Sequence, residues 1–172
     1  MPRLVACSAL VLSLTGCVAT KLSPERAIAA RDAFDRVTRE FHLPSAEATG
    51  LKKAELLAQA ARGYENLLHQ FNDQPIWCAQ ALRSLANIRA TQGALDEAVR
   101  LYLRVGEKYS REEWEVLQAW KSAGDLLWEA NRTNEARKHY TRLVNRFDAP
   151  GMPSIVLIIV NAAKKRLAAG AK

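Results

Sequence analysis

The sequence predicts an all-α fold, a helical solenoid, and three observations support that prediction. One pattern of alanine, tyrosine, aliphatic and aromatic residues occurs three times, with 38 residues from each copy to the next. Within each copy the steps are four, three and four residues, which place all four side chains on one face of a helix. No run alternates apolar and polar residues at period two, so almost no sheet is expected. The copies are Ala60-Tyr64-Leu67-Phe71, Ala98-Tyr102-Val105-Tyr109 and Ala136-Tyr140-Leu143-Phe147.

The first helix is predicted from Pro24 to His42. Ser23 provides an N-cap, Pro24 occupies the first helical position, and Glu25 places an acid in the first turn. Apolar residues from Ala27 to Phe41 line one face, and Leu43-Pro44 ends the helix. Residues 44–50 are predicted to form a loop.

Two helix pairs and their neighbours follow, each bounded by a turn signal. The residues after Phe71, ending at Pro75, break one helix, while Gly93 and Asn131 occupy the same turn position one period apart. Residues 110–113 link the two pairs. The predicted helices are 51–71, 76–92, 95–109, 114–130 and 134–147.

The first helices of the pairs carry a repeat of their own. Bulky residues recur at Leu82, Trp120 and Ile158, and small residues recur four positions later at Ala86, Gly124 and Ala162. Small residues are what close helix–helix contact requires, so a bulky residue at Gly124 should be costly.

The last helix is predicted from Ile155 to about Ala169, with Ser154 as its cap. Burial of Ile158 and Ala162 would leave Val156 and Ile159 for a second surface. One interpretation is a capping helix that is folded more deeply than usual. The other is a contact with a partner or a second subunit, because an exposed aliphatic patch otherwise favours aggregation.

The N-terminus looks like a bacterial lipoprotein leader. Arg3 precedes a predominantly apolar stretch of eleven residues, 4–14, which is too short to cross a membrane core that needs about 20. Leu14-Thr15-Gly16-Cys17 is similar to a lipobox, which implies that Cys17 carries diacylglycerol. Val18 is not the Asp that holds such proteins in the inner membrane, so the resemblance implies the periplasmic face of the outer membrane. The expected organisation is signal peptide 1–16, lipidated tether 17–23 and repeat domain 24–169; an ordinary cleaved leader is the alternative.

Charge and cysteine content leave the partner open. The net charge of +7 fits either a solvated surface of scattered charges, or attraction to anionic lipid or an acidic partner. Nucleic acid is not expected, because no basic run alternates with stacking aromatics. Cys78, beside Trp77, is expected to be a buried free thiol.

The repeat residues resemble the tetratricopeptide repeat family. Trp120 followed by Gly124, Gly93 or Asn131 at the turn, and Ala98 followed by Tyr102 carry the resemblance over residues 51–169. The longer period is similar to that of bacterial lipoproteins of outer-membrane β-barrel assembly and of the Tol–Pal system. The resemblance implies a right-handed superhelix with a C-terminal capping helix.

In that family, a concave groove lined by the first helix of each pair binds peptides or helices. The corresponding positions here are Gln80, Arg83, Asn87, Thr91, Gln118, Lys121, Asp125 and Trp128, with Val156, Ile159 and Ala163 from the last helix. Arg83 and Lys121 as a cation pair suit a carboxylate or an acidic peptide. Trp128 suits an apolar anchor. The alternative is that these are solvated polar positions.

Residues suited to catalysis are missing from the sequence patterns. His42, His69 and His139 have no second ligand at helical spacing, and no serine or glycine motif of known enzyme classes occurs. We therefore expect no cofactor, no metal and no enzymatic activity. The expected function is that of an adaptor for an envelope protein; the alternatives are a structural oligomer that uses the aliphatic last helix and an envelope hydrolase.

Overall fold

The computed structural model describes residues 23–169, in which every regular element is a helix and no strand occurs. The all-α prediction is confirmed for this part of the chain. The elements are α1 (Pro24–Val37), the π-helical stretch η1 (Thr38–His42), α2 (Pro44–Glu47), α3 (Gly50–Gln70), α4 (Pro75–Thr91), α5 (Leu95–Lys108), α6 (Glu113–Glu129), α7 (Thr133–Phe147) and α8 (Ser154–Ala169).

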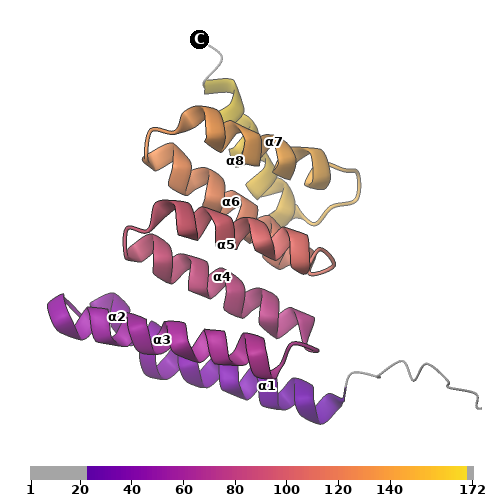
Figure 1. Cartoon of the computed structure of the whole chain (residues 1–172). Coiled ribbons are helices and arrows are strands. Elements are labelled where there is room, and N and C mark those ends of the chain that lie inside the picture. The colour runs from indigo at the N-terminus through magenta and orange to yellow at the C-terminus, as the bar shows by residue number, and fades with distance from the viewer. Residues whose placement is uncertain (1–22, 170–172) are drawn as a thin grey trace, which may run out of the picture.

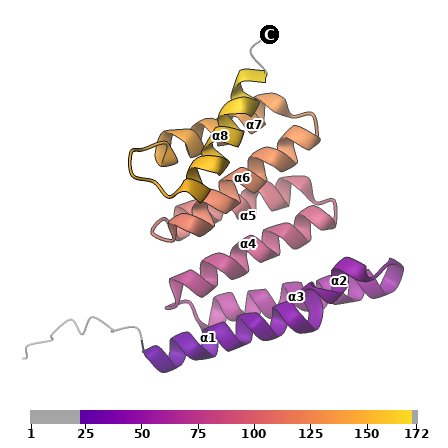
Figure 2. The same cartoon turned by 180° about the vertical axis from the view of Figure 1, so that it is seen from behind.

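The helices form two layers that run along one stack. Each helix from α3 onward packs on the next in sequence, and α4 also contacts α1 and α6, while α6 contacts α8. Figure 1 views the stack from the side of α3, α5 and α7, which we call the second-helix face. Figure 2 shows the opposite side, the first-helix face, formed by α1, α4, α6 and α8.

The repeated alanine–tyrosine pattern forms the centre of the core. Ala60, Ala98 and Ala136 are fully buried, and the tyrosines four residues later are buried in all three copies. The tyrosines are Tyr64, Tyr102 and Tyr140. This face of α3, α5 and α7 is therefore the face that packs on the first helices, as predicted.

The turn signals mark where the helices end. Gly93 has φ of 77° and Asn131 has φ of 60°, the left-handed conformation that glycine and asparagine tolerate best. The observed bounds of the five helices between residues 50 and 147 lie within one residue of the predicted ones. Cys78 is buried as expected, and its thiol donates a hydrogen bond to the Phe71 carbonyl over 3.0 Å.

The N-terminal segment differs from the prediction in two places. The first helix changes to a π-helical stretch at Thr38, and residues 44–47, predicted as loop, form the short helix α2. π-Helix is rare and occurs mostly as a single turn that continues an α-helix, as it does here. Here it brings Thr38 and His42 to the hydroxyl of Tyr64, at 2.8 and 3.0 Å.

The burial predicted for α8 is wrong by one residue. Ile159 is 8% exposed and Ala163 is buried, whereas Ile158 is 64% exposed and Ala162 lies on the surface. The cause is the connection after α7: α6 begins 38 residues after α4, but α8 begins 41 residues after α6. The exposed aliphatic residues of α8 are therefore Ile155 and Ile158. The predicted outward residues differ: Ile159 is in the core, and Val156 is half-buried.

Candidate functional site

The residues predicted to line a groove lie on α4 and α6, and several have structural tasks. The Tyr102 hydroxyl donates to Asn87 Oδ1 over 2.6 Å, and the Tyr140 hydroxyl donates to Asp125 Oδ1 over 2.7 Å. Both pairs are 15 residues apart in sequence and one period apart from each other. A buried hydroxyl without such a partner costs about 1–3 kcal/mol, so Asn87 and Asp125 stabilise the helix pairs.

The surroundings of Tyr140 and His42 shift the pKa of both side chains. Burial and the hydrogen bond to Asp125 raise the pKa of Tyr140, so its hydroxyl stays protonated and donates. Burial lowers the pKa of His42, which favours the neutral imidazole beside the Tyr64 hydroxyl. Both side chains therefore form their hydrogen bonds in the neutral form.

The predicted cation pair is already occupied by internal acids. Arg83 Nε lies 2.6 Å from Glu115 Oε2, and the side chain of Glu115 is only 3% exposed. Lys121 is bonded to Asp125, one turn along the same helix. An incoming carboxylate would have to displace these partners, so the two cations do not form the free site that the sequence suggested.

The remaining predicted residues occupy the same side of the stack. Arg166 lies over the Trp128 ring, 5.0 Å from its centre, so the aromatic anchor position is covered. Lys121, Asp125, Ile159 and Ala163 meet around a small cavity of about 210 Å³. Gln80 and Gln118 are half-buried, and Thr91 is exposed with its hydroxyl donating to the Asn87 carbonyl.

A surface that the sequence analysis missed lies on the second-helix face. Three basic residues on α5 recur 38 positions later on α7, each set spaced four residues apart. Five of the six are exposed and Arg146 is half-buried, and none forms an ion pair with any residue from 23 to 169. We call this set the basic ladder: Arg100, Arg104, Lys108, Lys138, Arg142 and Arg146. The charges look scattered in sequence. Alignment at the repeat period shows that each cation of α5 has a counterpart at the equivalent position of α7.

Two contacts hold the α5 and α7 parts of the ladder together. Arg132 at the start of α7 binds Asp96 at the start of α5, and Arg146 donates to the Ser110 carbonyl just beyond α5. The two helices are thus tied at both ends. Both halves of the ladder therefore belong to helices that are held in a fixed relative position.

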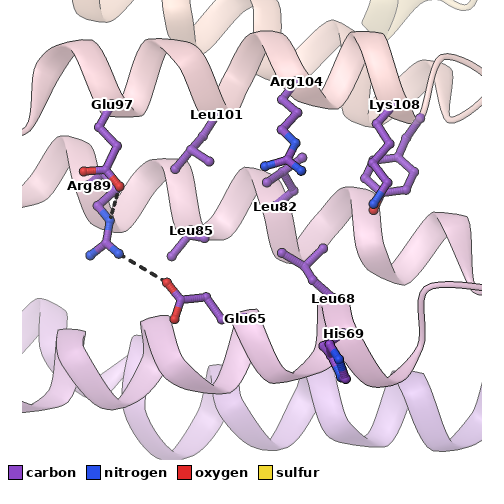
Figure 3. Close-up of a pocket in the computed structure, with 11 residues that line it drawn as sticks. Glu65, Leu68, His69, Leu82, Leu85, Arg89, Glu97, Leu101, Arg104 and Lys108 are labelled. Carbon is purple, nitrogen blue, oxygen red and sulfur yellow. Dashed lines mark hydrogen bonds and ion pairs between the residues drawn. The ribbon is translucent and has the colours of Figure 1, made fainter.

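A groove opens beside the ladder, between α3 and α5 and above α4. Its cavity measures about 420 Å³. The apolar lining consists largely of leucines, so we call it the leucine groove: Leu68 from α3, Leu82 and Leu85 from α4, and Leu101 from α5. Arg104 and Lys108 of the ladder form its edge on the α5 side (Figure 3).

The other end of the leucine groove carries one net negative charge. Arg89 on α4 lies 3.3 Å from Glu65 on α3 and 2.9 Å from Glu97 on α5, which links the three helices (Figure 3). The two acids outnumber the single cation at this end. The positive charge of the groove therefore lies at the end formed by Arg104 and Lys108.

Residues 23–169 hold no group of three or more potential metal ligands, and none of their helices has the length and apolarity needed to span a bilayer. No protein-family model, curated protein or solved structure matches the chain. The candidate site consists of the basic ladder and the leucine groove.

One core tyrosine provides a test of the hydrogen-bond pattern. The Tyr109 hydroxyl is buried without a partner among the described residues, since the nearby Cys78 thiol is a poor acceptor and donates to Phe71. The residues one period away are Phe71 and Phe147. We expect Tyr109→Phe to raise the free energy of unfolding by about 1 kcal/mol, and Tyr102→Phe to lower it by about 1 kcal/mol. Urea denaturation measures both, and a loss of equal size in the two variants would contradict the assignment.

Proposed function

We propose that the chain is a non-catalytic adaptor, a tetratricopeptide-like solenoid that binds an acidic segment of an envelope protein. The observation that carries the proposal is the basic ladder, whose six cations form no ion pair with residues 23–169. Unpaired charges of one sign on a surface attract an oppositely charged partner and accelerate its association.

The choice of face follows from the ion pairs. On the first-helix face, Arg83 and Lys121 are already bound to Glu115 and Asp125. On the second-helix face the cations face solvent. The proposal therefore keeps the predicted adaptor role and the acidic partner, and moves the binding surface from α4 and α6 to α5 and α7.

We further propose that Cys17 is acylated and holds the domain at the periplasmic face of the outer membrane. Support comes from the leader and from Leu14-Thr15-Gly16-Cys17. Cys17 lies outside the described residues. The first helix, α1, begins at Pro24, so the tether of 17–23 would keep the start of α1 close to the membrane.

Site-specific cross-linking in intact cells tests the adaptor function. A photo-reactive residue at position 100 or 138 should capture a partner through an acidic segment, whereas one at Lys52, on α3 away from the ladder, should not. With the captured partner purified, Arg100→Glu combined with Lys138→Glu should weaken binding at least about tenfold, and added salt should weaken wild-type binding. Binding that is insensitive to both salt and charge reversal would refute the proposal.

A further inference from the structure

Successive repeats of the chain have a groove at the same place, between two second helices and above a first helix. The leucine groove lies between α3 and α5 above α4; the next groove lies between α5 and α7 above α6. In the second groove Trp120 stands where Leu82 stands in the first. Trp120 is 8% exposed, so the chain itself fills this groove with an aromatic ring.

Two cations of the basic ladder cover that ring. Arg142 lies 5.5 Å and Arg146 5.6 Å from the centre of the Trp120 ring, within the range of a cation–π interaction. The Phe147 ring meets Trp120 edge-on, with 6.2 Å between centres. The second groove therefore shows what this site geometry accepts: an aromatic ring on an apolar floor, beneath two basic side chains.

The leucine groove has cations at the corresponding positions, and its lining includes Tyr109 and His69, but Leu82 stands in place of the Trp120 ring. Arg104 and Lys108 are the residues one period before Arg142 and Arg146. Lys108 lies 5.3 Å from the centre of the Tyr109 ring. Arg104 has neither a ring nor a carboxylate partner among residues 23–169, and it points from α5 into the groove (Figure 3).

The leucine groove has space for a ring because it differs from the next groove at two positions. Gly106, which faces Trp120, corresponds to Leu68 one period earlier. A Cβ at Gly106 would lie 2.5 Å from Trp120 Nε1, so Trp120 needs this glycine. With Leu82 in place of Trp120, the first groove instead holds a cavity of about 420 Å³, within the range of about 300–1,000 Å³ typical of ligand sites.

The two grooves also differ in how their helices are tied. Arg146 spans from α7 to the Ser110 carbonyl, whereas Lys108, its counterpart, makes no hydrogen bond to a described residue of α3. The charged end of the leucine groove is thus not closed by the chain. A ligand can enter there without breaking an internal ion pair, since Arg89, Glu65 and Glu97 lie at the other end.

We infer that the leucine groove binds one aromatic side chain from an acidic segment of a partner protein. The ring rests on Leu82 and Leu85 beneath Arg104, as Trp120 rests beneath Arg142. A neighbouring carboxylate of the segment pairs with Lys108 or Arg104 at the charged end. This inference rests on the proposed adaptor function and adds the anchor that gives the acidic partner its position on the ladder.

Short peptides test the anchor. The probe is a fluorescein-labelled pentapeptide with phenylalanine at its centre and two acidic residues on each side; the control has alanine at the centre. We expect saturable binding of the first below about 1 mM by fluorescence anisotropy, and binding at least about tenfold weaker for the second. Methyl NMR signals of Leu68, Leu82, Leu85 and Leu101 should shift on titration. Equal affinity of the two peptides, or no binding of the first, would overturn the inference.

Variants of the protein locate the site. Arg104→Glu with Lys108→Glu should weaken the phenylalanine peptide at least about tenfold, whereas Lys52→Glu with Lys165→Glu, the same charge change outside the ladder and the groove, should change its affinity less than about threefold. Leu68→Gly with Leu82→Trp copies the Gly106–Trp120 pair into the groove and should also abolish binding. Circular dichroism checks that each variant is folded, and the charge variants alter exposed residues only.

The outcomes separate the inference from the adaptor function. If Arg104→Glu with Lys108→Glu weakens the phenylalanine and alanine peptides equally, and the central residue has no effect on affinity, the basic ladder binds acidic segments without an anchor, and the groove inference is wrong. Vesicles of phosphatidylglycerol provide a further arm. Vesicle binding that requires Arg104 and Lys108 and fully displaces the phenylalanine peptide would show that these cations bind phosphate headgroups. If the alanine peptide displaces the phenylalanine peptide equally well, the groove inference is again wrong.

Discussion

Replacing Arg83 with methionine will lower the free energy of unfolding by about 3–5 kcal/mol. Glu115 is buried, with a side chain only 3% exposed, and Arg83 provides its ion-pair partner at 2.6 Å. Removing the cation leaves a carboxylate charge in the core without compensation, and this desolvation cost exceeds the direct energy of most ion pairs. Equilibrium unfolding in urea gives the value.

Two further variants separate this effect from a general loss of charge. Arg83→Met combined with Glu115→Leu removes both partners and should recover most of the lost stability, because no buried charge remains. Lys121→Met breaks a half-exposed ion pair on the same face and should cost about 1 kcal/mol or less. If Arg83→Met costs no more than Lys121→Met, Glu115 does not depend on Arg83.

Replacing Gly124 with leucine will lower the free energy of unfolding by about 3 kcal/mol or more. Even a Cβ at this position would lie 2.6 Å from Tyr140 Cε1 and 2.9 Å from Cδ1. The Tyr140 ring has little freedom to move, because its hydroxyl is bonded to Asp125 and its face packs near Trp128. The cost combines overpacking, about 1–3 kcal/mol, with weakening of a hydrogen bond to a charged group.

The chain offers a matched control for this substitution. Ala162 occupies the same position of the sequence repeat, 38 residues after Gly124, but lies on the surface of α8. Ala162→Leu should change stability by less than about 0.5 kcal/mol. Urea denaturation of both variants is the measurement, and losses of similar size would mean that the shifted burial of α8 is incorrect.

The repeated part of the fold could be predicted because its signals are local. Tyr64, Tyr102 and Tyr140 carry helical spacing on both sides, and Gly93 and Asn131 mark turns by their own backbone preference. The sequence alone therefore sufficed for the helices of residues 50–147 and for the core face of each second helix.

The features that were not predicted depend on geometry between distant residues. The burial of Ile159 in place of Ile158 follows from the longer connection before α8, whose path the repeat does not determine. The Arg83–Glu115 pair joins residues 32 positions apart, and nothing local in the sequence indicates it. The basic ladder was detectable in principle, by aligning Arg104 with Arg142 at the repeat period, but not from net charge.

The contacts between the second helices have a mechanical consequence. The Arg132–Asp96 ion pair and the Arg146–Ser110 hydrogen bond hold α7 to α5 at both ends. Within residues 23–169, the side-chain bridge between α3 and α5 is the one that Arg89 makes at one end. We expect the stack to bend more readily between α3 and α5, which are bridged at one end, than between α5 and α7, which are bridged at both ends. A side chain bound between α3 and α5 would fill the space between these two helices. It would thereby fix the angle between the part of the stack before α4 and the part after it.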